Sequence, residues 1–255
     1  MILLRSDIMK YILSILLVFV VTTAAMGADG AAVMYQVNGQ SYEGYYISPS
    51  DNAPLVVLIH DWDGLTDYEV KRAHMLAASG YAVFAADLFG AGVRPTEIVD
   101  KRQHTGELYK DRNKMRALMN GALETAGQKG AHIENVVAAG YCFGGAAVLE
   151  WARSGAKLKG FATFHGGLKT PEGQDYSRTE GSLLIMHGSA DSAITLDQFA
   201  ALAKELESAG VPHEMVTYSG AQHAFTVFNG SRYQEAADKK SWKLFHEYLA
   251  DTLMR

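Results

Sequence analysis

The chain of 255 residues contains a single cysteine, so no internal disulfide can form. It has only five prolines, and it lacks an excess of positive charge: 23 Lys and Arg residues stand against 28 Asp and Glu residues, a formal net charge of −5. Because nucleic-acid-binding proteins carry a basic face, this balance argues against a nucleic-acid partner. A hydrophobic fraction of 48% and a charged fraction of 20% are ordinary for a globular protein with a sizeable core.

Residues 1–27 have the pattern of a secretory signal peptide. Arg5 and Lys10 precede an apolar run from Ile12 to Val21, and small residues continue to Gly27. The run is shorter than the roughly 20 residues that a membrane span needs. We therefore expect cleavage near Gly27, export to a bacterial periplasm and no membrane association afterwards; an uncleaved N-terminal anchor is the alternative. Residues 28–255 are expected to form a single domain, as a monomer or small homo-oligomer.

Strands and helices alternate through the mature chain, which predicts an α/β fold with a mostly parallel central sheet covered by helices on both faces. The Asn38-Gly39 pair predicts a hairpin near the start. In such sheets, ligands bind beyond the C-terminal ends of the strands. The predicted strands are 33–37, 42–47, 55–60, 81–86, 136–141, 158–164, 183–187 and 214–218; the predicted helices are 66–80, 95–128 with a break near Thr105, 144–153, 195–210 and 233–253.

The most informative motif is Gly-Tyr-Cys-Phe-Gly-Gly at residues 140–145, between a predicted strand and a predicted helix. It matches the Gly-x-nucleophile-x-Gly elbow, with Cys142 as the nucleophile. Gly140 and Gly144 leave room for the sharp turn, and the start of the helix favours negative charge on the sulfur. The backbone N–H of Phe143 is then one oxyanion donor. The alternative is a buried cysteine packed among glycines.

A cysteine nucleophile needs a base, and the base needs an acid to orient it. Asp191 follows the predicted strand 183–187, and His223 lies in the loop after the predicted strand 214–218. The order nucleophile, acid, histidine is that of a hydrolase triad. Each of the two residues taken alone could be an ordinary loop residue, but together they predict a triad of Cys142, His223 and Asp191.

With these motifs, the chain resembles the dienelactone hydrolase family of α/β-hydrolases from about Gly44 to Leu253. The resemblance rests on the elbow and on segments 86–90, 187–191 and 220–225. It implies an α/β-hydrolase fold and the same triad. The family has a Glu that holds the resting thiol where this chain has Asp61. The next residue, Trp62, would give the second oxyanion N–H. Val227 stands where the founding enzymes carry a carboxylate-binding arginine, which weakens recognition of a diacid.

Aromatic and histidine residues near the predicted strand ends are candidates for the substrate pocket, with ordinary core packing as the alternative for each. They are His60, Phe89, Tyr141, His165 and Phe225. No cluster has the spacing of a metal site, so no metal or cofactor is expected.

The sequence thus predicts a cysteine-dependent hydrolase of small neutral esters or lactones that forms a covalent intermediate. A phosphotriesterase acting on activated aryl dialkyl phosphates with the same triad is the first alternative. A non-catalytic binding or thiol-sensing protein on the same fold is the second.

Overall fold

A computed structural model describes residues 29–254. The expected signal peptide and its cleavage site lie outside these residues, so both remain predictions. Within residues 29–254, no helix combines the length and apolar character needed to cross a bilayer.

Eight strands form one sheet in the order β1-β2-β4-β3-β5-β6-β7-β8. The predicted hairpin is confirmed: β1 and β2 pair antiparallel around Asn38 and Gly39, which have φ angles of 51° and 78°. β2 is also antiparallel to β4, and every later pair is parallel, as the alternation of strands and helices predicts. The strands are β1 (Ala31–Val37), β2 (Gln40–Ile47), β3 (Pro54–Ile59), β4 (Ala82–Ala86), β5 (His132–Tyr141), β6 (Gly160–Phe164), β7 (Ser182–Gly188) and β8 (His213–Tyr218).

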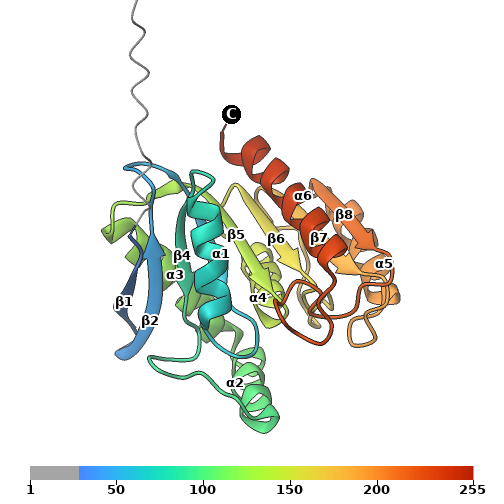
Figure 1. Cartoon of the computed structure of the whole chain (residues 1–255). Coiled ribbons are helices and arrows are strands. Elements are labelled where there is room, and N and C mark those ends of the chain that lie inside the picture. Colours follow the sequence, from blue (N-terminus) through green and yellow to red (C-terminus); the bar gives the residue numbers. More distant parts are fainter. Residues whose placement is uncertain (1–28, 255) are drawn as a thin grey trace, which may run out of the picture.

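Helices cover both faces of the sheet. In Figure 1, α1 and α6 lie in front of it, while α3 and α4 lie behind. Two apolar cores fill the two interfaces, and β3 supplies both: Val56 and Leu58 enter one core, whereas Leu55, Val57 and Ile59 enter the other. A strand buried on both faces must be apolar throughout, which explains the continuous hydrophobic run. The helices are α1 (Asp67–Ala77), α2 (Ile98–Lys110), α3 (Arg112–Gln128), α4 (Phe143–Arg153), α5 (Leu196–Ala209) and α6 (Glu235–Leu253).

The predicted break near Thr105 is wrong, because the chain breaks its helix at Asp111. The Thr105 hydroxyl donates to the Lys101 carbonyl over 2.9 Å, so this residue continues the helical turn. Asp111 ends α2 and begins α3, and its side chain accepts the Lys114 N–H at 2.9 Å. The break leaves α2 projecting beyond the end of the sheet (Figure 1).

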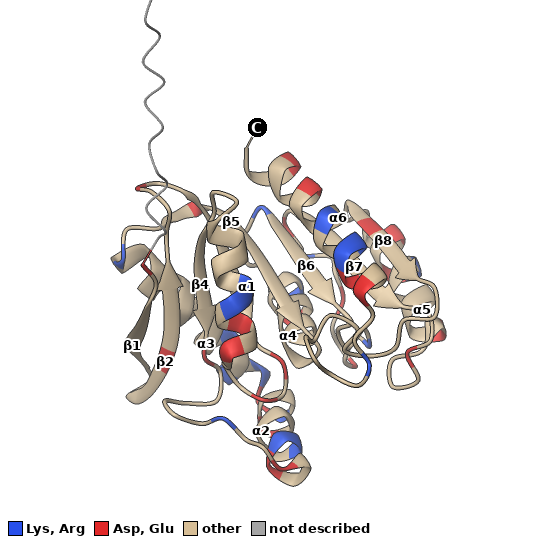
Figure 2. Ribbon diagram, in the orientation of Figure 1, with Lys and Arg blue, Asp and Glu red and all other residues tan. Residues whose placement is uncertain are grey.

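Acidic and basic side chains are interspersed on the outer helices (Figure 2). On α6, Lys239 pairs with Glu235 and Lys243 pairs with Glu247, each one helical turn apart. Such exposed pairs contribute little to stability, and they balance the charge of this face locally.

Candidate active site

Cys142 sits at the turn between β5 and α4 in a strained backbone conformation. Its φ and ψ angles are 51° and −111°, which a residue with a side chain rarely adopts. The turn is closed tightly: a Cβ on Gly140 would lie 2.3 Å from the Gly144 carbonyl, and one on Gly144 would lie 2.3 Å from the Ile59 carbonyl. Only glycine fits these two positions, and the elbow therefore packs directly onto the end of β3.

The structure brings Cys142, His223 and Asp191 together. The Nε2 atom of His223 lies 3.0 Å from the Cys142 Sγ, and its Nδ1 lies 2.7 Å from the Asp191 Oδ2. Since a carboxylate accepts hydrogen bonds and cannot donate one, Nδ1 of His223 carries a proton and donates the hydrogen bond to Asp191. The other oxygen of Asp191 accepts the backbone N–H groups of Ala193 and Ile194, both at 2.9 Å. The acid is thus fixed on both sides.

Backbone contacts join the two loops that carry the acid and the base. The Ala190 N–H donates to the Ala221 carbonyl at 2.9 Å, and the Ser189 N–H donates to the Tyr218 carbonyl at 3.0 Å. A Cβ on Gly188 would lie 2.4 Å from the Ala221 oxygen, so the loops after β7 and β8 touch directly. The spacing between Asp191 and His223 is therefore built into the backbone.

The charges of the site favour a protonated imidazole beside the sulfur. Burial acts to lower the pKa of His223, but hydrogen bonds with Asp191 and Cys142 outweigh it and raise the pKa to about 10. Burial acts to raise the pKa of Asp191, yet the bonds from His223 and from the Ile194 N–H lower it. The ring thus lies between a carboxylate that orients it and a sulfur within hydrogen-bond reach.

The two expected oxyanion donors lie on adjoining segments. Phe143 is the first residue of α4, and Trp62 is in the turn after β3. Because Gly144 packs on the Ile59 carbonyl, the first turn of α4 rests against the segment that leads to Trp62. The N–H groups at the start of a helix have no intrahelical partner and can bind negative charge.

Asp61 lies beside the site and is 8% exposed. Its Oδ1 accepts the Asp63 N–H at 2.8 Å, while the thiol of Cys142 is paired with His223. Burial is the main reason that the pKa of Asp61 is raised to about 6, with the nearby positive charges of Lys101 and His223 acting against it. The charge of His223 therefore acts on the pKa of Asp61.

The five expected pocket residues occupy different environments. Phe89 packs at a tilt against Phe143, with 5.6 Å between ring centres, and so lies beside the start of α4. The ring of His165 is 5.3 Å from that of His223 and is fully buried behind it. His60 is also fully buried.

The pocket role does not fit Tyr141 and Phe225, which both pack in the core under α1 and α6. The Tyr141 ring stacks on Phe164 at 4.7 Å, on the face of the sheet opposite α4. Side chains alternate along a strand, and Tyr141 immediately precedes Cys142, so its ring leaves the sheet on that other side. Phe225 packs against Tyr218 and His165.

Sequence patterns did not indicate a cavity of about 430 Å³ whose lining includes Ala146, four residues after Cys142, and Ile194, three residues after Asp191. Tyr109, at the end of α2, packs its ring on Phe143 at 5.5 Å, and Ala146 lies one helical turn after Cys142. No local motif marks Tyr109, because only the tertiary fold brings α2 over the elbow. The cavity is lined by Tyr109, Arg112, Ala146, Arg153, Gly167, Lys169, Pro171, Glu172, Ile194 and Gln198.

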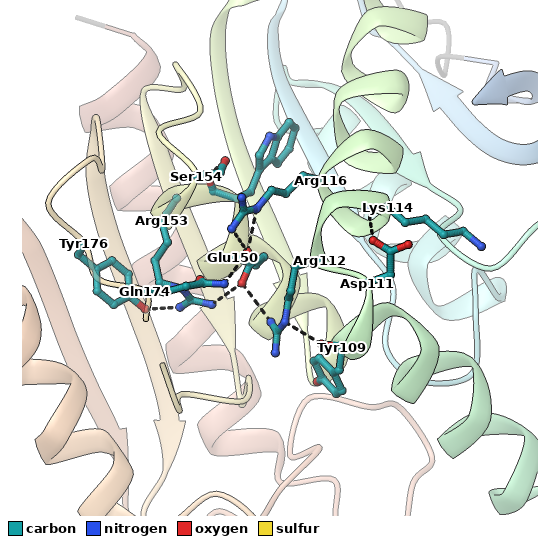
Figure 3. Close-up of polar contacts among 12 residues, drawn as sticks. Tyr109, Asp111, Arg112, Lys114, Arg116, Glu150, Arg153, Ser154, Gln174 and Tyr176 are labelled. Carbon is teal, nitrogen blue, oxygen red and sulfur yellow. Dashed lines mark hydrogen bonds and ion pairs between the residues drawn. The ribbon is translucent and has the colours of Figure 1, made fainter. Parts of the chain in front are cut away.

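A buried carboxylate holds the charged wall of this cavity in place (Figure 3). Glu150 of α4 is fully buried and binds three arginines. Its Oε2 accepts from Arg112 and Arg153, each at 3.1 Å, and its Oε1 accepts from Arg116. Burial acts to raise the pKa of Glu150, but Arg116 and Arg153 lower it. The cluster ties α3 to α4 and fixes Arg112 at the cavity.

No group of three or more His, Cys, Asp or Glu residues among residues 29–254 has the arrangement of a metal site.

Comparison with known proteins places this geometry in a family. The sequence pattern of the Dienelactone hydrolase family matches residues 42–253. A Salmonella typhimurium protein provisionally named carboxymethylenebutenolidase is 24% identical over 225 residues, covering 83% of each chain.

Solved structures agree with the fold. A dienelactone hydrolase-like promiscuous phosphotriesterase from metagenomic libraries superposes with a TM-score of 0.83 and 29% identity, over 89% of this chain and 99% of that one. An acylaminoacyl peptidase from Pyrococcus horikoshii, at 16% identity, covers 90% of this chain and 42% of its own with a TM-score of 0.70, which shows a shared α/β-hydrolase fold.

Proposed function

The chain belongs to the dienelactone hydrolase family of ester hydrolases, and we propose that it is a cysteine-dependent hydrolase of small neutral esters or lactones. The observation that carries this proposal is the pairing of Cys142 with His223 at 3.0 Å, on a strained elbow and with Asp191 behind the ring. A nucleophile within hydrogen-bond reach of a base, which a third group orients, is the arrangement that covalent catalysis requires.

In the proposed reaction, the Cys142 thiolate attacks the ester carbonyl and forms a tetrahedral thiol adduct. The negative oxygen of this adduct accepts hydrogen bonds from the backbone N–H groups of Phe143 and Trp62. As the adduct collapses, protonated His223 gives its proton to the leaving alcohol, and an acyl-thioester remains on Cys142. Neutral His223 then takes a proton from water, whose oxygen attacks the thioester; the acid product leaves and the cysteine–histidine pair is restored.

The preference for neutral substrates rests on the surroundings of the triad. Val227, four residues after His223, offers no charge to a substrate carboxylate. Arg112 and Arg153 line the cavity, but both bind Glu150. Lys169 and Glu172 add one charge of each sign. Glu150 carries one negative charge against three arginines, so the cavity wall keeps an excess of positive charge, and the preference for an uncharged ester or lactone rests on Val227.

Phosphotriester hydrolysis is the second candidate, and the similarity to a phosphotriesterase at 29% identity over nearly its whole length favours it. Aryl dialkyl phosphates are neutral, and their P=O oxygen gains negative charge during attack as a carbonyl oxygen does. The same two N–H groups would therefore serve both reactions.

The deciding experiment compares wild type with Cys142→Ala on an aryl ester, a lactone, a carboxylate-bearing lactone and an aryl dialkyl phosphate. We expect the variant to fold and to lose more than about a hundredfold in kcat, because a triad nucleophile contributes far more than this. Iodoacetamide should inactivate the wild type equally, since Cys142 is its only thiol.

A variant that keeps more than about a hundredth of the wild-type kcat would overturn the nucleophile assignment. Absence of a burst and of turnover on every substrate would instead favour the binding or thiol-sensing alternative. Fastest turnover of the carboxylate-bearing lactone would contradict the preference for neutral substrates.

We further propose that the protein is exported to the periplasm, on the basis of the charged and apolar pattern of residues 1–27. Cell fractionation and N-terminal sequencing of the mature protein test this. A mature chain that starts near Gly27 in the periplasmic fraction is the expected result, and an intact N-terminus in the membrane fraction would support the anchor instead.

A further inference from the structure

We propose that His60 is a positioning residue for the oxyanion hole, acting through the peptide that joins Asp61 to Trp62. The inference rests on the proposed function, because it requires that the Trp62 N–H binds the oxyanion. The carrying observation is a hydrogen bond of 2.6 Å between the His60 Nδ1 and the Asp61 carbonyl oxygen. That carbonyl and the Trp62 N–H belong to one peptide unit. His60 therefore binds the carbonyl end of the peptide group whose N–H end is the proposed oxyanion donor.

The peptide is planar and trans, so its C=O and N–H point in opposite directions. A hydrogen bond that fixes the direction of the Asp61 carbonyl also fixes the direction of the Trp62 N–H. The same bond draws electron density toward the carbonyl oxygen, which makes the N–H at the other end a stronger donor. Both effects are present before the substrate arrives, as preorganised oxyanion stabilisation requires.

The hydrogen-bond partners of His60 determine its tautomer. A carbonyl oxygen only accepts, so Nδ1 must carry the proton. On the other side of the ring, Nε2 lies 3.1 Å from the backbone N of Leu88, whose N–H it must accept. The neutral ring with its proton on Nδ1 satisfies both bonds. Full burial is the main cause that lowers the pKa of His60 to about 4, which keeps this neutral form in place.

His60 also contacts the residue that carries the other oxyanion donor. Its ring stacks on Phe143 with 6.0 Å between ring centres and 30° between planes, and Phe89 packs edge-on against it at 4.6 Å. A Cβ on Gly144 would lie 2.5 Å from the His60 carbonyl, so the backbone of His60 touches the first turn of α4 as well. One buried ring thus fixes the relative position of Phe143 and Trp62.

The sequence makes His60 a candidate for the substrate pocket. Its full burial argues against that role. The ring lies behind the proposed oxyanion hole and acts on the donors without touching the substrate. Its contribution should therefore appear in the transition state and leave binding of the ground state unchanged.

Two substitutions separate the bonds of His60. In His60→Asn, the amide nitrogen takes the place of Nδ1 and can still donate to the Asp61 carbonyl, but the acceptor for Leu88 is lost. In His60→Gln, the amide oxygen takes the place of Nε2 and can accept from Leu88, but the donor to Asp61 is lost. Asn leaves the larger void because its side chain is one methylene shorter, so the stability of both variants is measured beside their activity.

With an aryl ester, we expect His60→Gln to lower kcat about tenfold or more with little change in KM, and His60→Asn to stay within a few-fold of wild type. The Gln loss should shrink when the carbonyl oxygen of the substrate is replaced by sulfur, a weaker hydrogen-bond acceptor. Thermal unfolding of both variants shows whether stability follows activity.

Equal kcat losses in the two variants, a loss confined to KM, or an undiminished loss with the thionoester would overturn the proposal. If neither variant folds, ¹⁵N NMR of the wild-type histidines decides: a protonated Nδ1 with a bare Nε2 on His60 supports the proposal, and the opposite tautomer refutes it. Failure of the proposed function is distinguishable, because it would appear as retained activity in Cys142→Ala whatever the His60 variants do.

Discussion

The Nε2 atom of His165 lies 2.8 Å from the Oγ1 atom of Thr226, three residues after His223. The same hydroxyl lies 2.8 Å from the phenol oxygen of Tyr68 on α1. His165 and Thr226 are fully buried, and His165 has a φ of 41°, a strained value for a residue with a side chain. The loop that carries the base is thus anchored from behind to β6 and α1.

Replacement of Thr226 by Val should lower the free energy of unfolding by about 1–3 kcal/mol, because His165 and Tyr68 would each lose a buried partner of nearly unchanged shape. Urea denaturation measures the change. Thr217→Val, at an exposed position of β8, is the control and should stay within about 0.5 kcal/mol of wild type. Equal effects at the two positions would mean that the anchor contributes nothing.

Phosphotriester turnover should depend on sulfur as the nucleophile. Attack by Cys142 on an aryl dialkyl phosphate releases the phenol and leaves a phosphorothiolate, and water then releases the dialkyl phosphate. Thiolate is a weaker base than alkoxide and leaves more readily. We expect many turnovers for wild type and one equivalent of phenol for Cys142→Ser, measured by phenol release against enzyme concentration. A wild type that also stops after one equivalent contradicts the phosphotriesterase candidate.

The pH dependence of stability should carry the signature of Glu69. Burial, followed by the charge of Asp61, raises the pKa of this carboxyl to about 8. An acid whose pKa is raised on folding keeps its proton longer in the folded than in the unfolded chain, so the fold loses stability as the pH rises from about 4.5 to about 8. Below that window both states are protonated and the contribution is constant.

Glu69→Gln should remove this loss, because the amide cannot ionise and can still accept from the N–H and hydroxyl of Thr66. Urea denaturation at several pH values across this window measures the free energy of unfolding. The value for the variant should rise relative to that for wild type as the pH rises. The exposed Glu134→Gln is the control, with the wild-type profile expected. A constant difference between Glu69→Gln and wild type at every pH would refute the assignment.

Glu150→Ala should destabilise the fold by about 3–5 kcal/mol, because three arginines would lose the buried carboxylate that they share. Arg116→Met should cost less, since Glu150 keeps two arginines and the Arg116 side chain is 29% exposed. Chemical denaturation of both variants gives the comparison. A loss below about 1 kcal/mol in Glu150→Ala would show that the cluster is not a stabilising unit.

Local patterns were sufficient for the elements that local chemistry determines. The helices expected from residues 66 and 195 begin at Asp67 and Leu196, behind the N-caps Thr66 and Thr195, and the Asn38-Gly39 turn forms as the sequence predicts. The helix break was misplaced because the β-branched Thr105 bonds back to its own helix, whereas Asp111 caps the next one.

Some residues of the candidate site could likewise be predicted from local patterns, and others could not. Cys142, Asp191 and His223 could be proposed because each follows a recognisable strand, and the ends of parallel strands meet at one edge. Tyr109, Glu150 and the roles of the buried histidines could not, because each depends on which side chain from a distant segment fills the adjoining space. Whether His60 lines a pocket or supports the backbone is decided by burial, and no spacing in the sequence encodes it.

The residues of the site are also synthesised in a fixed order. Trp62 leaves the ribosome first, Cys142 follows, and His223, on the loop after the last strand of the sheet, comes late. The imidazole is held beside the thiol by the loop after β8, the strand that pairs with β7. A chain truncated before β8 would therefore keep Cys142 but lack the imidazole that lies beside it in the complete sheet.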